Sequence, residues 1–135
     1  MQFKTLIFFL LISISCFSQE IGIVKNGNYS IKLLKIDKLF SFTYSDVNSK
    51  NSNDENSFDF PNIDTMYQIV MDGFDYHNDH QVIVQTSKDT IVKFDFKKVN
   101  GKKMLMIRQR SLLSEKLSTS TFFTKDEIIK LFGNS

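Results

Sequence analysis

The chain of 135 residues has a single cysteine, a single proline and no tryptophan, and these shortages limit what it can be. Its cysteine, Cys16, lies in an apolar N-terminal segment, so the rest of the chain can form no disulfide. A domain without disulfides depends on its hydrophobic core, and about 117 residues are enough for one such domain. Phenylalanine, with 14 copies, must therefore supply much of the volume of that core.

The first 18 residues have the pattern of a secretory signal peptide. Lys4 supplies the positive charge, residues 5–15 are mostly apolar, and the small residues Cys16 and Ser18 precede the predicted cleavage site. The apolar segment is shorter than the roughly 20 residues of a membrane-spanning helix. We therefore predict cleavage after Ser18 and export to the periplasm or the medium, without a transmembrane span in the mature chain. In an alternative interpretation, Cys16 is acylated and anchors a lipoprotein.

Charge is distributed unevenly along the chain. Residues 19–87 contain five Lys or Arg and ten Asp or Glu, whereas residues 88–135 contain eleven and five. Formal net charges of −5 and +6 follow for the two parts. This asymmetry could attract an anionic partner, but internal pairing or a solvated sheet face would produce it equally well.

The clearest structural pattern surrounds Asn100-Gly101, which joins two segments of alternating apolar and polar residues. Asn-Gly is the preferred pair for a two-residue type I′ turn, because both central positions need a positive φ. Such a turn pairs Phe94 with Ile107 on an apolar face. A three-residue loop with a bulge would oppose Phe94 to Met106 instead, and the type I′ register is the favoured one.

The other apolar patterns predict an α+β domain over residues 19–135. Further strands are expected at 29–36, 39–44 and 81–86, with possible shorter ones at 21–24 and 116–122. Together with the hairpin, they predict a mostly antiparallel sheet of about five or six strands with two helices packed on it.

The two helices are predicted from apolar spacing and from capping residues. Residues 62–73 have one apolar face, and Gly73 suits the position after the end of that helix. Thr124 and Glu127 form a capping box at the start of the second helix. Residues 45–57 are polar and of low complexity, which predicts a mobile surface loop.

The segment between the first helix and the next strand holds the candidate metal ligands Asp75, His77, Asp79 and His80. Imidazole and carboxylate groups bind zinc and other divalent ions, and His77 and His80 could place two donors together. The spacing fixes no third ligand. The simpler interpretation is a polar helix-to-strand connection, where these residue types are ordinary turn formers.

The outer face of the predicted hairpin is the candidate partner face, formed by Lys93, Lys97, Met104, Met106 and Arg108. Basic side chains on a strand could contact phosphates, lipid headgroups or acidic glycans. A solvated sheet face would carry the same charges. The two methionines among these charges indicate cover by a helix, a self-association surface or a slipped register.

No catalytic pattern is present in the sequence. It contains no mature cysteine nucleophile, no nucleophile elbow, no phosphate-binding glycine loop and no HExxH motif. Nucleic acid is not expected as a partner, because Phe94 and Phe96 are expected on the opposite face from the basic side chains. The sequence therefore predicts neither an enzyme class nor a cofactor.

Two short segments carry a resemblance to known precursors. The signal ending Cys16-Phe17-Ser18-Gln19-Glu20, together with an Asn-, Lys-, Ile- and Phe-rich body, resembles small exported proteins of the Bacteroidota such as flavobacteria. The segment Phe123–Gly133 is similar to C-termini of proteins in that group. The resemblance implies export and brings no activity with it.

These observations predict an exported, non-catalytic envelope protein that acts as a small binding or interaction module. Its expected partner is another envelope protein or an anionic ligand. The alternative is a metal-binding or metal-dependent role for Asp75, His77, Asp79 and His80.

Overall fold

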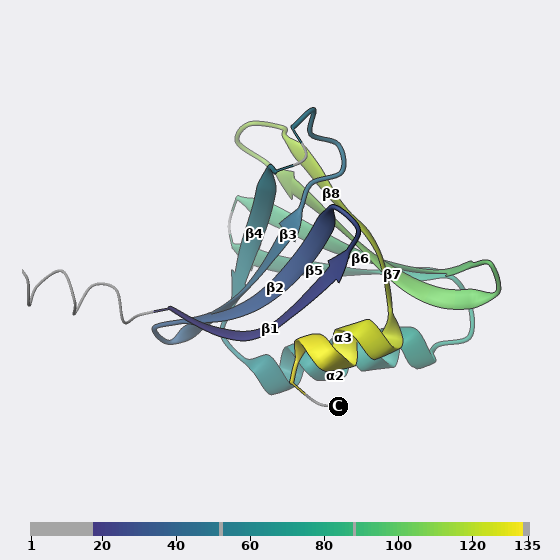
Figure 1. Ribbon diagram of the computed structural model, residues 1–135. Coiled ribbons are helices and arrows are strands. Elements are labelled where there is room, and N and C mark those ends of the chain that lie inside the picture. Colours follow the sequence, from purple (N-terminus) through teal and green to yellow (C-terminus); the bar gives the residue numbers. More distant parts are fainter. Residues whose placement is uncertain (1–17, 52, 88, 134–135) are drawn as a thin grey trace, which may run out of the picture.

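The computed structural model describes residues 18–51, 53–87 and 89–133, except for the side chains of residues 85–87. Its strands form two antiparallel four-stranded sheets (Figure 1). The first sheet has the order β1 (Ser18–Asn26), β2 (Tyr29–Ile36), β3 (Leu39–Ser45), β4 (Glu55–Phe60). The second has the order β5 (His80–Ser87), β6 (Thr90–Val99), β7 (Lys102–Ser111), β8 (Leu117–Thr124).

The structure confirms antiparallel sheets with two helices, but the prediction of one sheet of five or six strands is wrong. Helix α2 (Ile63–Asp75) connects β4 to β5 and carries the chain from one sheet to the other. The sequence prediction missed β4, because Glu55, Asn56 and Ser57 belong to the polar segment assigned to a loop at 45–57. With β4 present, the first half of the chain has enough strands for a sheet of its own.

The hairpin of β6 and β7 has the predicted type I′ register. Asn100 and Gly101 have φ values of 53° and 81°, and Phe94 pairs with Ile107. Both of these apolar side chains are buried on the inner face of the sheet. The alternative register, with Phe94 opposite Met106, is therefore excluded.

The core lies between the inner faces of the two sheets and is closed at one end by the helices (Figure 1). Phe58 and Phe94 meet across the two sheets, with their ring centroids 6.1 Å apart. Helix α3 (Lys125–Leu131) begins with the predicted capping box of Thr124 and Glu127. Phe132, which follows α3, packs edge-to-face on Phe42 at 5.6 Å. None of the helices within the described residues is long and apolar enough to cross a membrane.

Each half of the chain is a four-stranded meander followed by a helix, a repetition that the sequence does not show. Counted from the two-residue turns at 37–38 and 100–101, the pair Ile31–Tyr44 in the first sheet corresponds to the pair Phe94–Ile107 in the second. The repeat is one of backbone topology, since the equivalent side chains differ in type.

A polar seam joins the sheets at the end away from the helices. The Tyr44 hydroxyl donates to Oε1 of Gln109 at 2.8 Å, and Nε2 of Gln109 donates to the Ser57 carbonyl at 2.9 Å. The buried Asp46 carboxylate accepts from the Thr119 backbone N–H at 3.1 Å. Within the described residues, no buried side-chain nitrogen or oxygen lacks a hydrogen-bond partner.

Gly73 lies inside α2. The prediction that it follows the end of the helix is therefore wrong. A Cβ atom at this position would lie 2.2 Å from Cζ of Phe96, whose side chain is 1% exposed. The missing side chain therefore lets the Phe96 ring fit against the helix.

The substitution Gly73→Ala tests this close approach. Helix propensity alone would stabilise the variant by up to about 1 kcal/mol. We expect a loss of about 1–3 kcal/mol in the free energy of unfolding instead, because the ring must move within a packed core. Urea unfolding measures the change. In the Phe96→Leu background the same substitution should cost much less, and a stabilised single variant would contradict the packing argument.

The pH dependence of stability tests the burial of Tyr44. Burial, and secondly the negative charge of Asp46, raise the pKa of the Tyr44 hydroxyl well above its usual value near 10. Because the folded pKa exceeds the unfolded one, this stabilisation is complete below about pH 10 and is lost as the pH rises beyond it. We expect Tyr44→Phe to lower stability at pH 8 by about 1–3 kcal/mol, since Gln109 loses its donor.

Between pH 10 and pH 11.5, the free energy of unfolding of Tyr44→Phe should fall less than that of the natural protein. Urea unfolding measures both. Tyr76→Phe is the matched control, because the Tyr76 side chain is half exposed. Equal alkaline slopes for the natural protein and Tyr44→Phe would contradict this assignment.

Candidate functional site

The outer face of the second sheet carries the residues predicted as a partner face. Lys93 pairs with Arg108, and Lys97 pairs with Met104, on the neighbouring strands β6 and β7. Asp95 faces Met106 in the row between them. All five predicted residues therefore share this face, which points away from the core.

The two methionines are less accessible than expected of a free apolar patch. Met106 is 7% exposed, and Met104 is half-buried. On β8, Phe122 is the cross-strand neighbour of Met106, and the Lys97 amino group lies 5.6 Å from the centroid of the Phe122 ring. Neighbouring side chains on the outer face thus surround Met106, although the predicted register is correct.

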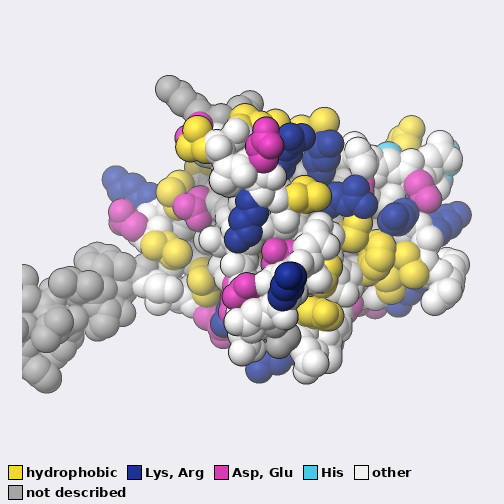
Figure 2. All heavy atoms as spheres, turned by 90° about the horizontal axis from the view of Figure 1, so that it is seen from above, with side chains coloured by type: hydrophobic (Ala, Val, Ile, Leu, Met, Phe, Trp, Pro, Cys, Tyr) yellow, Lys and Arg dark blue, Asp and Glu magenta, His cyan; other side chains and the backbone are white. Residues whose placement is uncertain are grey.

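A hollow of about 420 Å³ lies on this face, next to the loop that joins β7 to β8. Figure 2 shows the molecule from the end opposite the helices, where Lys and Arg side chains lie beside hydrophobic ones. The hollow combines basic and apolar lining with one acidic side chain, and its lining residues are Ile91, Lys93, Arg108, Arg110, Leu112, Glu115 and Leu117. Leu112 and Leu117 remain 48% and 51% exposed.

Only part of the positive charge around the hollow is neutralised. Nε of Arg108 lies 3.1 Å from Oδ2 of Asp95, whose side chain is 9% exposed. Lys93 and Arg110 form no ion pair with any of the described residues. The local field is therefore positive, and two cations can bind an anion without giving up an existing partner.

The lining residues fall into rows across the strands. Lys93 and Arg108 occupy one row, and Ile91, Arg110 and Leu117 occupy the next row toward the loop. Successive residues on the same face of a strand are roughly 7 Å apart. The cations of the first row are thus separated from the loop by a partly apolar row.

Sequence reasoning identified Lys93 and Arg108 but missed the other lining residues. The hairpin register alone places Ile91 opposite Arg110, so these two could have been assigned to the same face. Leu112 and Leu117 depend on the course of the β7–β8 loop. Their spacing in the sequence gives no periodic signal from which that course could be predicted.

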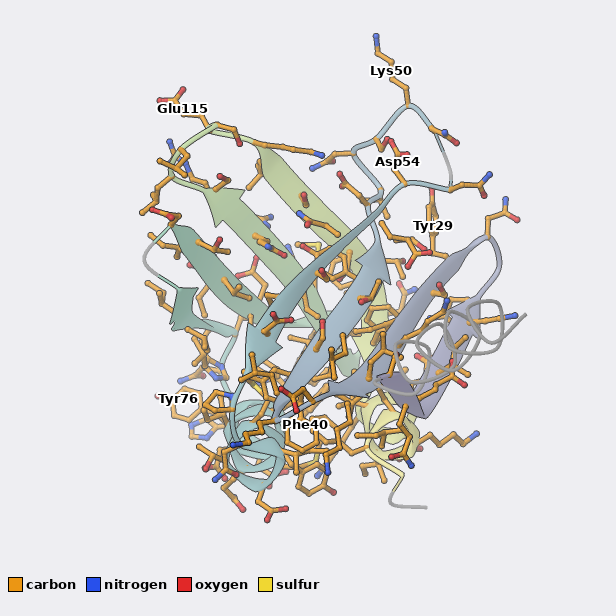
Figure 3. All side chains as sticks on the ribbon, turned by 90° about the vertical axis from the view of Figure 1, so that its left-hand side faces the viewer. Tyr29, Phe40, Lys50, Asp54, Tyr76 and Glu115 are labelled. Carbon is orange, nitrogen blue, oxygen red and sulfur yellow. The ribbon has the colours of Figure 1, made fainter. Side chains whose placement is uncertain are left out.

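The candidate metal ligands Asp75, His77, Asp79 and His80 lie near the helices. Tyr76 marks this end of the molecule, and Glu115 marks the opposite end (Figure 3). The Lys125 amino group donates to Oδ1 of Asp75 at 2.8 Å, so this carboxylate already has a cationic partner. That ion pair raises the pKa of Lys125.

Of the remaining three candidates, His77 and His80 both pack on the Tyr76 ring, whereas Asp79 is bonded elsewhere. Asp79 accepts a hydrogen bond from the Lys98 backbone, the His80 ring stacks on Phe96 at 5.1 Å, and His77 stacks on Tyr76. In the part of the chain that the structure describes, no three His, Cys, Asp or Glu side chains gather closely enough to hold a metal ion. The arrangement does not favour the metal interpretation, which stays a prediction.

The histidines also show no catalytic pairing. Among the described residues, the one hydrogen bond made by a histidine ring is between His80 Nδ1 and the Asn78 backbone carbonyl. A hydroxyl nucleophile would instead need a histidine nitrogen within hydrogen-bond distance.

Comparisons with known proteins give no match: no family model, no curated protein and no solved structure is significantly similar to this chain. Its function must therefore be argued from the geometry of its own residues.

Proposed function

We propose that the chain is an exported, non-catalytic binding module that takes an anionic ligand on the outer face of the second sheet. The observation that carries this proposal is the hollow beside Lys93, Arg108 and Arg110. Two of these cations have no anionic partner among the described residues, and the hollow is in the size range of small-molecule sites.

The distribution of charge supports the same face. Residues 88–135, which include most of the second sheet, carry a formal net charge of +6, against −5 for residues 19–87. An anion approaching the molecule is therefore attracted to the half that contains the hollow. The neutralised Arg108 contributes less to this attraction than Lys93 and Arg110 do.

NMR of the isotope-labelled, purified protein tests the proposal. We expect acetate, inorganic phosphate or octanoate, added in turn, to shift the backbone amides around Ile91, Lys93 and Arg110. The shifts should weaken as sodium chloride is raised, because salt screens exposed charges. If none of the three anions shifts these amides, the proposed function is wrong.

Charge-reversal variants make this test specific. Lys93→Glu with Arg110→Glu should reduce anion affinity about tenfold or more, because attraction becomes repulsion. Lys38→Glu with Lys50→Glu is the matched control, since it changes the net charge equally at two exposed positions that do not line the hollow. Equal losses in both double variants would show that only the net charge matters, which would contradict a site at the hollow.

A further inference from the structure

The hollow has an apolar part that a simple anion would leave unused. Ile91, Leu112 and Leu117 contribute hydrophobic side chains to the lining, and two of these are about half exposed. Leu113, in the same loop, is 79% exposed. Exposed apolar side chains gathered in one place commonly mark an interaction site.

Charge and apolar surface are arranged in order along the hollow. Lys93 and Arg108 form the row farther from the β7–β8 loop, Arg110 lies between Ile91 and Leu117 in the next row, and Leu112 follows in the loop. Glu115 also lines the hollow and belongs to that loop. A negatively charged group would be repelled near Glu115 and attracted toward Lys93, so the charges define an orientation for a bound anion.

The dimensions fit a small molecule with one charged end. At roughly 30 Å³ for each water-sized group, 420 Å³ has room for roughly fourteen non-hydrogen atoms. Asp95 neutralises Arg108, and Glu115 offsets one of the two remaining cations, so the hollow has a net formal charge of about +1, which matches a single carboxylate or similar head better than a polyanion. Leu117 and Leu112 can then cover a hydrocarbon tail.

We propose that the ligand of this hollow is a single-chain amphiphilic anion. Its head lies between Lys93 and Arg110, and its tail lies along Leu117 toward Leu112. This inference rests on the proposed function and deepens it by naming the chemical class of ligand.

Calorimetric titration with three matched probes tests the proposal. Octanoate has both head and tail, acetate has the head alone, and octanol has the tail alone. Each buried methylene contributes roughly fourfold to affinity. We therefore expect octanoate to bind at least about tenfold more tightly than acetate, even with a partly covered tail. It should also bind at least about tenfold more tightly than octanol, which lacks the charge.

Two double variants separate the head from the tail. Leu112→Ser with Leu117→Ser should lower octanoate affinity to nearly that of acetate and leave acetate binding unchanged. Ile36→Ser with Leu39→Ser is the matched control, because both side chains are exposed and neither lines the hollow. Lys93→Glu with Arg110→Glu should remove the preference for octanoate over octanol. Circular dichroism verifies that each variant is folded.

The outcomes distinguish this inference from the function on which it rests. If acetate or phosphate binds at the hollow as tightly as octanoate, the ligand is not an amphiphile, although the proposed anion site remains supported. Failure of all the anions would overturn both. Adsorption to vesicles of anionic phospholipid without octanoate binding would also overturn it, because the leucines would then meet a membrane surface and not a single chain.

Discussion

The burial of one apolar face from each sheet against the other is the constraint on which this structure depends. A sheet of four strands with one apolar face needs a partner to cover that face, and here each sheet is the partner of the other. Phe58 and Phe94 meet at this contact, and the helices fill the end where Phe42 packs on Phe132. The buried inner side chains of the described residues belong to this core, whereas the hollow lies on the outer face of the second sheet.

The polar seam connects that constraint to the candidate site. Asp46 and Val47 bond to the backbone of Thr119, two residues after Leu117 in β8. On the other side of the hollow, the Leu112 N–H donates to the Asp89 carbonyl at 2.8 Å, which ties the β7–β8 loop to the β5–β6 connection. The two leucines that line the hollow are therefore held by backbone hydrogen bonds and not by their own burial. This explains how apolar side chains can stay exposed at fixed positions.

Local patterns in the sequence were sufficient for the elements that depend on local chemistry. Asn100-Gly101 specified its turn and thereby the register of β6 and β7, and Thr124 specified the start of α3. Long-range features were harder. The sequence prediction missed β4 because Asn56 and Ser57 are residue types common in loops. In the structure, Asn56 bonds to Ser118 of the other sheet.

The candidate site was predictable only in part, for the same reason. Lys93 and Arg108 follow from the hairpin register, so the basic character of the face was correctly expected. The apolar side of the hollow depends on the β7–β8 loop, which bonds to Asp89, and on the start of β8, which bonds to the turn after β3. The spacing of residues in the sequence does not predict such long-range contacts.

The most direct measurement is a crystal structure of the protein grown with octanoate. We expect a carboxylate between Lys93 and Arg110 and a tail directed along Leu117 toward the β7–β8 loop. Octanoate bound elsewhere, for example at the exposed Ile36 and Leu39 of the first sheet, with the hollow empty, would contradict it.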